Sequence, residues 1–277
     1  MPAPPGPGYT SAHEVAESGA VIFACSTDVA AWPWLELAPQ HPVVIQTQNF
    51  WSSVGAGAAM GSLDESKWSA LTWTDWNLGE RDAGDAVRGV YERTQVGDDL
   101  AFITRLYDAA DRLIVTMRGK GVVFRTRNFE KWREGSKKEA VSRTLLADFD
   151  FAPRELLGLG ERELPLVSQL EGERARALVS KENGLMPGHP YFSGSGDHVN
   201  APHLAEIARQ IASQVAGGAP ILVTHGEMDM HRYVELGCPI DIEVTGREDC
   251  SVALAISQLD RSCARLSMSF SERNDHR

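Results

Sequence analysis

One helix can be placed in this chain with well-defined ends, and it constrains how the neighbouring residues fold. Asn200 offers a capping side chain, and Pro202 stands in the first turn, where a missing N–H costs nothing. The Ala-Gly-Gly-Ala-Pro run at 216–220 stops the helix near Val215. One face carries mainly small and aliphatic side chains, namely Ala205, Ala208, Ile211, Ala212 and Val215. Such a face is typical of a buried helix, so this segment is predicted to be a central element of the fold.

Polar side chains interrupt that face at Glu206, Arg209 and Gln210. On spacing alone, a Glu and an Arg three residues apart read as an ordinary surface pair, and His198 ahead of the helix reads as a loop histidine. The lead-in, residues 189–197, combines a short extended run with a Gly/Ser-rich loop. These residue types leave open whether the segment is structural or carries chemistry.

Three short motifs resemble those of known families. Residues 197–210 resemble the D-H-V-x-x-x-x-L-x-E-x-A-R-Q pattern of the A-factor (γ-butyrolactone) biosynthesis hot-dog family, and residues 232–239 resemble its R-Y-x-E-L-x-x-P strand entry. Residues 190–194 resemble the P-F-F-x-G lead-in of hot-dog β-hydroxyacyl carrier-protein dehydratases, whose central helix carries a catalytic Glu where Glu206 falls. The chain departs from the A-factor family at Asn200-Ala201, where Pro-Gly is usual, and at His203, where an aliphatic residue is usual.

The resemblance implies an α+β fold, a tandem (double) hot-dog in which each half has a long central helix wrapped by a curved antiparallel sheet. The order of predicted elements agrees, because a helical stretch in each half, Val43–Met60 and 201–215, is followed by strand-like runs. Five parts are expected: a disordered N-terminal tail (1–15), an N-terminal hot-dog (16–127), a linker helix (128–150), a C-terminal hot-dog (151–271) and a short tail (272–277).

The two halves form a weak internal repeat. A shift of 157 residues places His41 on His198 and Asn49 on Glu206. An Asn side chain can orient a carbonyl group but cannot accept and return a proton near neutral pH. The first half is therefore predicted to be a degenerate scaffold and the second half the working one.

The resemblance also implies where catalysis occurs. The first turn of a hot-dog helix presents free N–H groups and a positive dipole end, which can polarise a thioester carbonyl. His198 and Glu206 are the expected catalytic pair, each moving a proton on one side of the substrate. Arg209 and Gln210 would hold Glu206 ionised and oriented. The other expected substrate-orienting residues are Tyr191, Asp197, Asn200 and His203, with His41 and Asn49 in the first half.

No cofactor and no metal are expected. His225 and His231 flank residues 226–230, but their spacing matches no compact ligand motif, so a turn is predicted there. His203 falls one turn before Glu206, and its position leaves two alternatives, a place in the site or exposure to solvent.

Composition excludes several classes of partner. The formal net charge of -11 argues against nucleic acid and against an anionic membrane surface. No apolar run approaches the roughly 18 residues of a membrane span. The four cysteines show neither metal spacing nor a disulfide framework, so a cytoplasmic location is expected. A tandem chain can pair the sheet edges of its two halves and so form an internal pseudo-dimer. Whether two such chains also form a homodimer is left open by the sequence.

Three functions fit these observations. The first is an enzyme of secondary metabolism that condenses a β-ketoacyl thioester with a phosphate-bearing three-carbon alcohol, as a butyrolactone synthase would, with the phosphate received by Arg209, Arg232 or Arg247. The second is a dehydratase, isomerase or cyclase acting on a polyketide or β-hydroxyacyl thioester. The third is a non-catalytic hot-dog binding module.

In both enzymatic cases the expected partner is an acyl carrier protein or a CoA thioester. Carrier proteins are acidic, so docking on this acidic chain would need a local basic face. The predicted linker helix offers one, with Lys131, Arg133, Lys137, Lys138 and Arg143. A weaker alternative lies early in the second half, where acidic residues are interleaved with Arg154, Arg162, Arg174 and Arg176.

Overall fold

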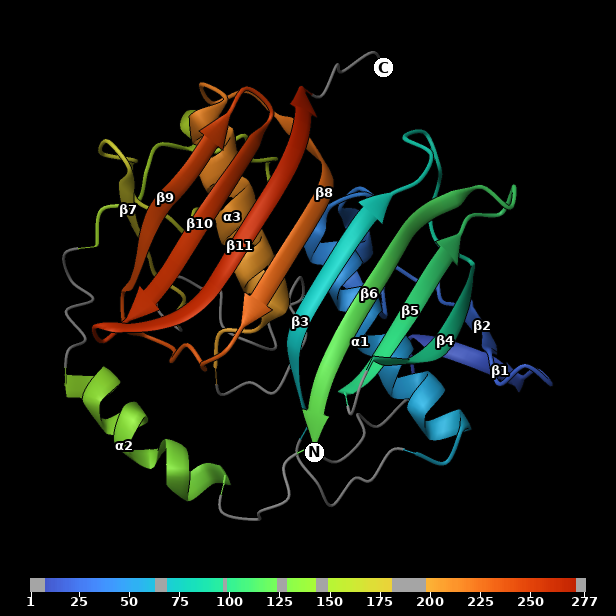
Figure 1. The fold of residues 1–277 in the computed structure, drawn as a ribbon. Helices are drawn as coiled ribbons and strands as arrows, with labels where there is room; N and C mark the ends of the chain where they lie inside the picture. Colours follow the sequence, from blue (N-terminus) through green and yellow to red (C-terminus); the bar gives the residue numbers. More distant parts are fainter. Residues whose placement is uncertain are drawn as a thin grey trace. The chain divides into compact units, whose positions relative to one another are not determined.

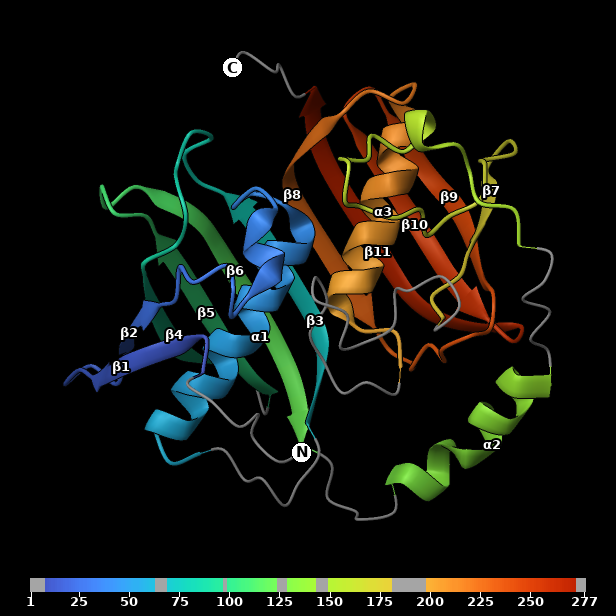
Figure 2. The same ribbon diagram turned by 180° about the vertical axis from the view of Figure 1, so that it is seen from behind.

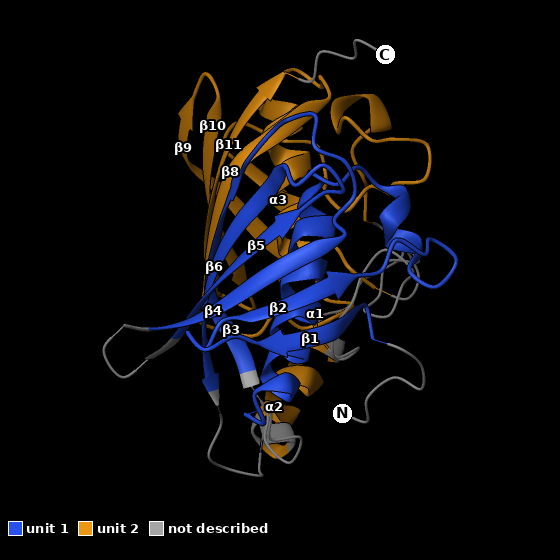
Figure 3. Ribbon diagram, turned by 90° about the vertical axis from the view of Figure 1, so that its right-hand side faces the viewer, with its two compact units in different colours: residues 1–129 blue, residues 130–277 orange. Residues whose placement is uncertain are grey.

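The computed structural model describes residues 8–62, 69–96, 99–123, 129–142, 149–180 and 198–272. The chain divides into two compact units, residues 1–129 (unit 1) and 130–277 (unit 2), which Figure 3 distinguishes by colour. Figures 1 and 2 show from opposite sides that each unit has an antiparallel sheet with one long helix lying against it. The α+β architecture predicted for each half is confirmed.

Unit 1 has the strand order β1-β2-β4-β5-β6-β3, and every neighbouring pair is antiparallel. The strand-like runs predicted after the helix correspond to β3 to β6. The elements of unit 1 are β1 (Thr10–Val15), β2 (Val21–Cys25), η1 (Pro33–Glu36), α1 (Pro42–Ala59), β3 (Ser69–Leu78), β4 (Arg88–Val96), β5 (Asp99–Tyr107) and β6 (Leu113–Val123).

Helix α1 begins where the sequence supplies a cap and a proline. His41 stands at the N-cap, where its Nδ1 accepts a hydrogen bond from the N–H of Val43 at 3.2 Å, and Pro42 is the first helical residue. The helix lies against β1, β2 and β4. The predicted helix Val43–Met60 is confirmed to within one residue at each end.

The disordered tail predicted for residues 1–15 is wrong in its second part, because Thr10–Val15 form β1. This strand pairs antiparallel with β2, with a break in register between Ser11 and Glu14 that marks a bulge. Ala12, inside the bulge, has a φ of 49°. Most residues of β1 are polar or exposed, so the strand depends on its partner for stability, and no local pattern reveals it. Residues 1–7 lie outside the described part of the chain.

Unit 2 has the strand order β8-β11-β10-β9-β7, again antiparallel throughout. The predicted linker helix 128–150 corresponds to α2, which ends at Ser142, and residues 143–148 are not described. The elements are α2 (Phe129–Ser142), η3 (Arg154–Leu156), β7 (Arg174–Ala177), α3 (Ala201–Val215), β8 (Ile221–Met230), β9 (Ile240–Glu248), β10 (Ser251–Gln258) and β11 (Arg261–Glu272).

Helix α3 has the bounds that the sequence predicts, and its apolar face forms the centre of unit 2. Ile207, Ala208, Ile211 and Ala212 have no exposed surface, and the helix lies against β8, β10 and β11. Burying an isoleucine side chain contributes about 1.5–3 kcal/mol relative to leaving it in water. The helix is thereby fixed in rotation about its own axis, which in turn fixes the direction of its polar side chains.

The turn predicted at residues 226–230 is wrong, because β8 continues through Met230. Val223 and Met228 are buried, whereas Glu227 and Asp229 are exposed. Burial therefore alternates along the segment, as in a strand with one face exposed to solvent. Pairing with β11 extends over the whole segment. Among the described helices, none combines the length and the apolar composition needed to cross a membrane.

Candidate active site on helix α3

Glu206 is held in place by residues of its own helix. Its side chain lies on α3 and is 3% exposed. Oε2 accepts a hydrogen bond from Nε of Arg209 at 2.8 Å, and Oε1 accepts from Nη2 of Arg209 at 2.7 Å and from Nε2 of Gln210 at 2.8 Å. The contact with Arg209 is bidentate, a geometry that fixes both the position and the plane of a carboxylate.

Arg209 is a buried cation shared by two carboxylates. Its Nη2 lies 2.6 Å from Oε1 of Glu163, and its Nη1 donates to the carbonyl of Gly158 at 3.1 Å. Burial lowers the pKa of Arg209. The charge of Glu206, the hydrogen bond to it and the charge of Glu163 raise this pKa by more than burial lowers it, so the net shift is upward. Arg209 therefore stays cationic inside unit 2. No sequence pattern pointed to Glu163, which lies 46 positions before Arg209.

Side-chain amides tie an irregular segment, residues 164–170, to α3. Gln210 donates from Nε2 to the carbonyl of Leu164 at 3.0 Å, and its Oε1 accepts from the N–H of Leu166 at 2.8 Å. One turn later, Gln214 repeats the arrangement with the carbonyl of Ser168 at 3.0 Å and the N–H of Leu170 at 2.8 Å. Each side-chain amide donates one hydrogen bond to the backbone and accepts one from it, as the backbone of a neighbouring strand would. This attachment keeps Glu163, just ahead of the segment, beside Arg209.

The start of α3 is organised by Asn200 and His203. Asn200 is the N-cap residue, and its Oδ1 lies 2.6 Å from Nδ1 of His203. His203 has no exposed surface, so the alternative in which it faces solvent is wrong. A contact between His203 and a substrate stays a prediction.

His198 lies two residues before the N-cap and is half-buried. Its ring meets the ring of Tyr233 edge-on, with centres 4.7 Å apart. The neighbouring Val199 forms an antiparallel bridge with Val234. The two motifs at 197–210 and 232–239, which resemble the same family, therefore meet in space. The catalytic role of His198 stays a prediction.

In unit 1, the two residues predicted to orient a substrate lie on or beside α1. His41 is the N-cap described above. Asn49 is 1% exposed and donates from Nδ2 to Oγ1 of Thr74 at 3.3 Å, while its Oδ1 has no hydrogen-bond partner among the described residues. Tyr191 and Asp197, also predicted for the site, lie outside the described residues.

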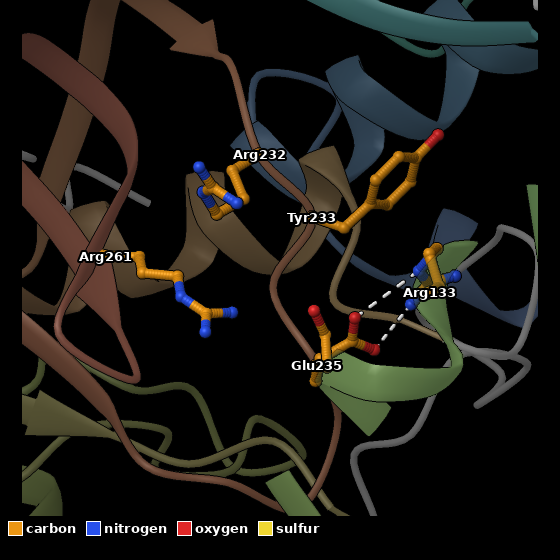
Figure 4. A pocket seen from close by; sticks show the side chains of 6 residues that line it. Arg133, Arg232, Tyr233, Glu235 and Arg261 are labelled. Carbon is orange, nitrogen blue, oxygen red and sulfur yellow. Dashed lines mark hydrogen bonds and ion pairs between the residues drawn. The ribbon is translucent and has the colours of Figure 1, made fainter. Parts of the chain in front are cut away.

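A second polar feature of unit 2 is a cavity of about 210 Å³ beside α2 (Figure 4). Arg133 of α2 is 2% exposed, and its Nη2 lies 2.5 Å from Oε2 of Glu235. The prediction that Arg133 belongs to a basic docking face is therefore wrong, because its charge is buried and paired. Six residues line the cavity: Arg133, Ser136, Arg232, Tyr233, Glu235 and Arg261.

The cysteines have the character of structural thiols. Cys25, Cys238 and Cys263 are buried, Cys250 is exposed, and all four are free. Burial raises the pKa of Cys25 to about 12 and also raises the pKa of Cys263. A thiol must lose its proton to act as a nucleophile, so neither of these two side chains is suited to that role.

Comparisons with known proteins bear on the fold. No protein-family model and no curated protein matches the sequence. An acyl-ACP thioesterase from Bacteroides thetaiotaomicron is similar in structure, with a TM-score of 0.55 and 10% identity over 83% of this chain and 89% of that chain. The 12:0-ACP thioesterase from Umbellularia californica is also similar, with a TM-score of 0.55 and 11% identity over 92% of this chain and 97% of that chain.

The peroxisomal multifunctional enzyme type 2 from Drosophila melanogaster gives a TM-score of 0.50 and 9% identity over 82% of this chain and 40% of that one. At such low identity, structural likeness carries the fold and not the reaction. The fold is the double hot-dog that the sequence predicts.

Proposed function

We propose that this protein is an enzyme that acts on an acyl thioester, with unit 2 as the working half and Glu206 as its general base. One observation carries the proposal: a buried carboxylate on the central helix is gripped by Arg209 and Gln210 through three hydrogen bonds. A general base must be held in one orientation to remove a proton efficiently. Two of the similar structures are thioesterases by description, which supports this substrate class.

Hydrolysis is the reaction that suits this arrangement best. Glu206 would take a proton from water while the water oxygen attacks the thioester carbonyl carbon. The first turn of α3 would stabilise the resulting oxyanion through its N–H groups, each worth on the order of 3 kcal/mol when well aimed. The carbon–sulfur bond then breaks, and the departing sulfur receives a proton, for which His198 is the proposed donor.

A dehydratase needs an acid to protonate the departing hydroxyl group, whereas both oxygens of Glu206 accept hydrogen bonds from Arg209 and Gln210, so this geometry favours hydrolysis over dehydration. Condensation with a phosphate-bearing alcohol would need an arginine other than Arg209 to receive the phosphate, because Arg209 already bonds Glu206, Glu163 and Gly158 and has little capacity left.

The test is turnover by the Glu206→Gln variant. We expect kcat for hydrolysis of acyl-CoA and acyl-N-acetylcysteamine thioesters to fall by about 10²–10⁴-fold, because the amide keeps the shape of the side chain but cannot take a proton. Release of free thiol and the mass of the product are the measurements. Glu243→Gln is the matched control, since it removes the same charge from an exposed position on β9 of the same unit.

The product also separates the competing reactions. Loss of water without thiol release would select dehydration, and a gain in mass with dihydroxyacetone phosphate would select condensation. Hydrolysis that continues unchanged in a folded Glu206→Gln variant would contradict the assignment of the base.

A further inference from the structure

The cavity beside α2 is basic, although the chain as a whole is acidic. Three of its six lining residues are arginines and only one is a carboxylate, in a chain with a formal net charge of -11. Arg232 and Arg261 face the pair formed by Arg133 and Glu235 from the other side of the space (Figure 4). Such a cluster in a concave site attracts anions.

The three arginines differ in how their charges are compensated. Arg133 is buried against Glu235, and Nη2 of Arg261 lies 3.1 Å from Oε2 of Glu139. Arg232 is exposed and has no ion-pair partner within the described residues. The cavity therefore contains one guanidinium group, that of Arg232, whose charge none of the described side chains neutralises.

The positions of these groups are set by packing. Arg261 follows a two-residue turn in which Leu259 and Asp260 have φ of 56° and 57°, the signature of a tight hairpin. Leu259 is 8% exposed and clusters with Ala140 of α2 and Cys238. Because the turn is packed on α2, the guanidinium groups from the two elements are presented to the same space before any ligand arrives.

One residue connects the cavity to the proposed site. The Tyr233 ring lies against the guanidinium of Arg133, whose central carbon is 4.7 Å from the ring centre. The same ring meets the ring of His198, with centres 4.7 Å apart. An anion in the cavity would therefore lie next to the segment that leads into α3.

We propose that this cavity binds the phosphate of a 4′-phosphopantetheine arm, the group that carries an acyl thioester. Guanidinium groups match phosphate oxygens with paired, charge-assisted hydrogen bonds. A phosphate would supply the negative charge that no described residue places beside Arg232. This inference rests on the proposed function for its substrate class. The arm is shared by coenzyme A and by acyl carrier proteins, and the experiment below distinguishes these sources.

The direct test compares 4′-phosphopantetheine with pantetheine, two probes that differ only in the phosphate. We expect isothermal titration calorimetry on the full chain to show about tenfold tighter binding of the phosphorylated probe, which corresponds to about 1.4 kcal/mol. Arg232→Gln and Arg261→Gln should remove most of this preference. Arg265→Gln, which removes the same charge from an exposed position on β11, should keep it.

The kinetic test identifies the source of the arm. In Arg232→Gln, KM should rise about tenfold for the acyl thioester of CoA, of a holo carrier protein, or of both, with a far smaller change for an N-acetylcysteamine thioester, which has no phosphate. A rise for only one of the two substrates identifies that one as the source of the arm, and a rise for both shows that the cavity reads the phosphate whichever carrier holds it. Arg133 is left intact in every variant, because removing it would leave the buried Glu235 without its ion-pair partner.

The outcomes separate this inference from the proposed function. Equal binding of the two probes, or a phosphate preference that survives both Arg232→Gln and Arg261→Gln, overturns the phosphate site even if Glu206-dependent hydrolysis is found. A phosphate preference that depends on Arg232 supports the site even if none of the thioesters is hydrolysed, and in that case it is the proposed reaction that fails.

Discussion

Glu206 and Arg209, both buried, form an ionic cluster with the partly buried Glu163, and the three members depend on one another. Charges removed from water are stable only while they compensate each other, so an intact cluster contributes little net stability but is costly to break. Arg209 is the member in contact with both carboxylates. Its loss leaves two negative charges close together without the cation between them, one of them buried.

We expect Arg209→Met to lower the free energy of unfolding by about 3–5 kcal/mol, because methionine fills similar volume but removes the cation that lies between Glu206 and Glu163. Urea unfolding followed by circular dichroism measures the change. Adding Glu206→Gln to Arg209→Met should recover part of the loss, because one of the stranded charges is then removed. A loss below 1 kcal/mol in Arg209→Met would show that the cluster is not desolvated as described.

Much of this cluster was visible in the sequence, and part of it was not. Glu206, Arg209 and Gln210 lie within five positions on one helix, and helical periodicity alone places them together. Glu163 joins them from an irregular segment, held through backbone contacts to Gln210 and Gln214. A contact between a helix and a segment without periodicity leaves no local signal, so only the folded chain reveals it.

At the scale of elements, the hairpin between β5 and β6 is closed by a carboxylate. Asp108 accepts hydrogen bonds from the N–H groups of Gly84, Ala110 and Arg112, at 2.9 Å each, and from Nε of Arg112 at 2.8 Å. The bond from Gly84 lowers the pKa of Asp108 most, burial opposes it, and the bonds from Arg112 and Ala110 lower this pKa further. Only the ionised form of Asp108 makes all of these bonds.

The stability that Asp108 contributes is therefore pH-dependent. Its pKa is lower in the folded than in the unfolded chain, so the contribution is fully present above the usual value near 3.8 and is lost as the pH falls below it. We expect Asp108→Asn to lower the urea midpoint more at pH 6 than at pH 3. Asp111→Asn, an exposed change in the same turn, should show a much smaller effect at both values. An equal effect of Asp108→Asn at the two pH values would contradict this account.

The elements that the sequence predicted well are those with local determinants. Helix α3 has a cap, a proline and a glycine pair, and its bounds were predicted without error. Strand β1 and the second part of β8 were missed, because their exposed faces carry polar side chains and their pairing partners lie elsewhere in the chain. Pairing across the sheet, rather than propensity, decides such segments.

At the scale of the whole molecule, the two units share a plan and differ in chemistry. Where α3 carries Glu206 bound to Arg209, α1 carries Asn49, whose carbonyl oxygen has no hydrogen-bond partner among the described residues. Gln46, Gln48 and Ser52 on α1 are also buried. A helix with amides in place of a carboxylate can bind but cannot exchange protons, so a single working site per chain is the expected arrangement.

We therefore expect one equivalent of a non-hydrolysable acyl-CoA thioether to bind per chain in isothermal titration calorimetry, because unit 2 combines the carboxylate of Glu206 with the arginine-lined cavity, whereas α1 carries Asn49 in place of the carboxylate. The same stoichiometry should hold in Glu206→Gln, which keeps the shape of the site. Two equivalents of equal affinity would contradict the assignment of unit 1 as a degenerate half.

The bulge in β1 also bears on how the protein behaves among copies of itself. This strand is the last in the strand order of unit 1, and such a strand is where a second chain could add its own backbone and continue the sheet. The break between Ser11 and Glu14 leaves no uninterrupted ladder of N–H and C=O groups along these six residues. Aggregation by strand addition is thereby discouraged at this edge by backbone geometry, without the need for a covering element.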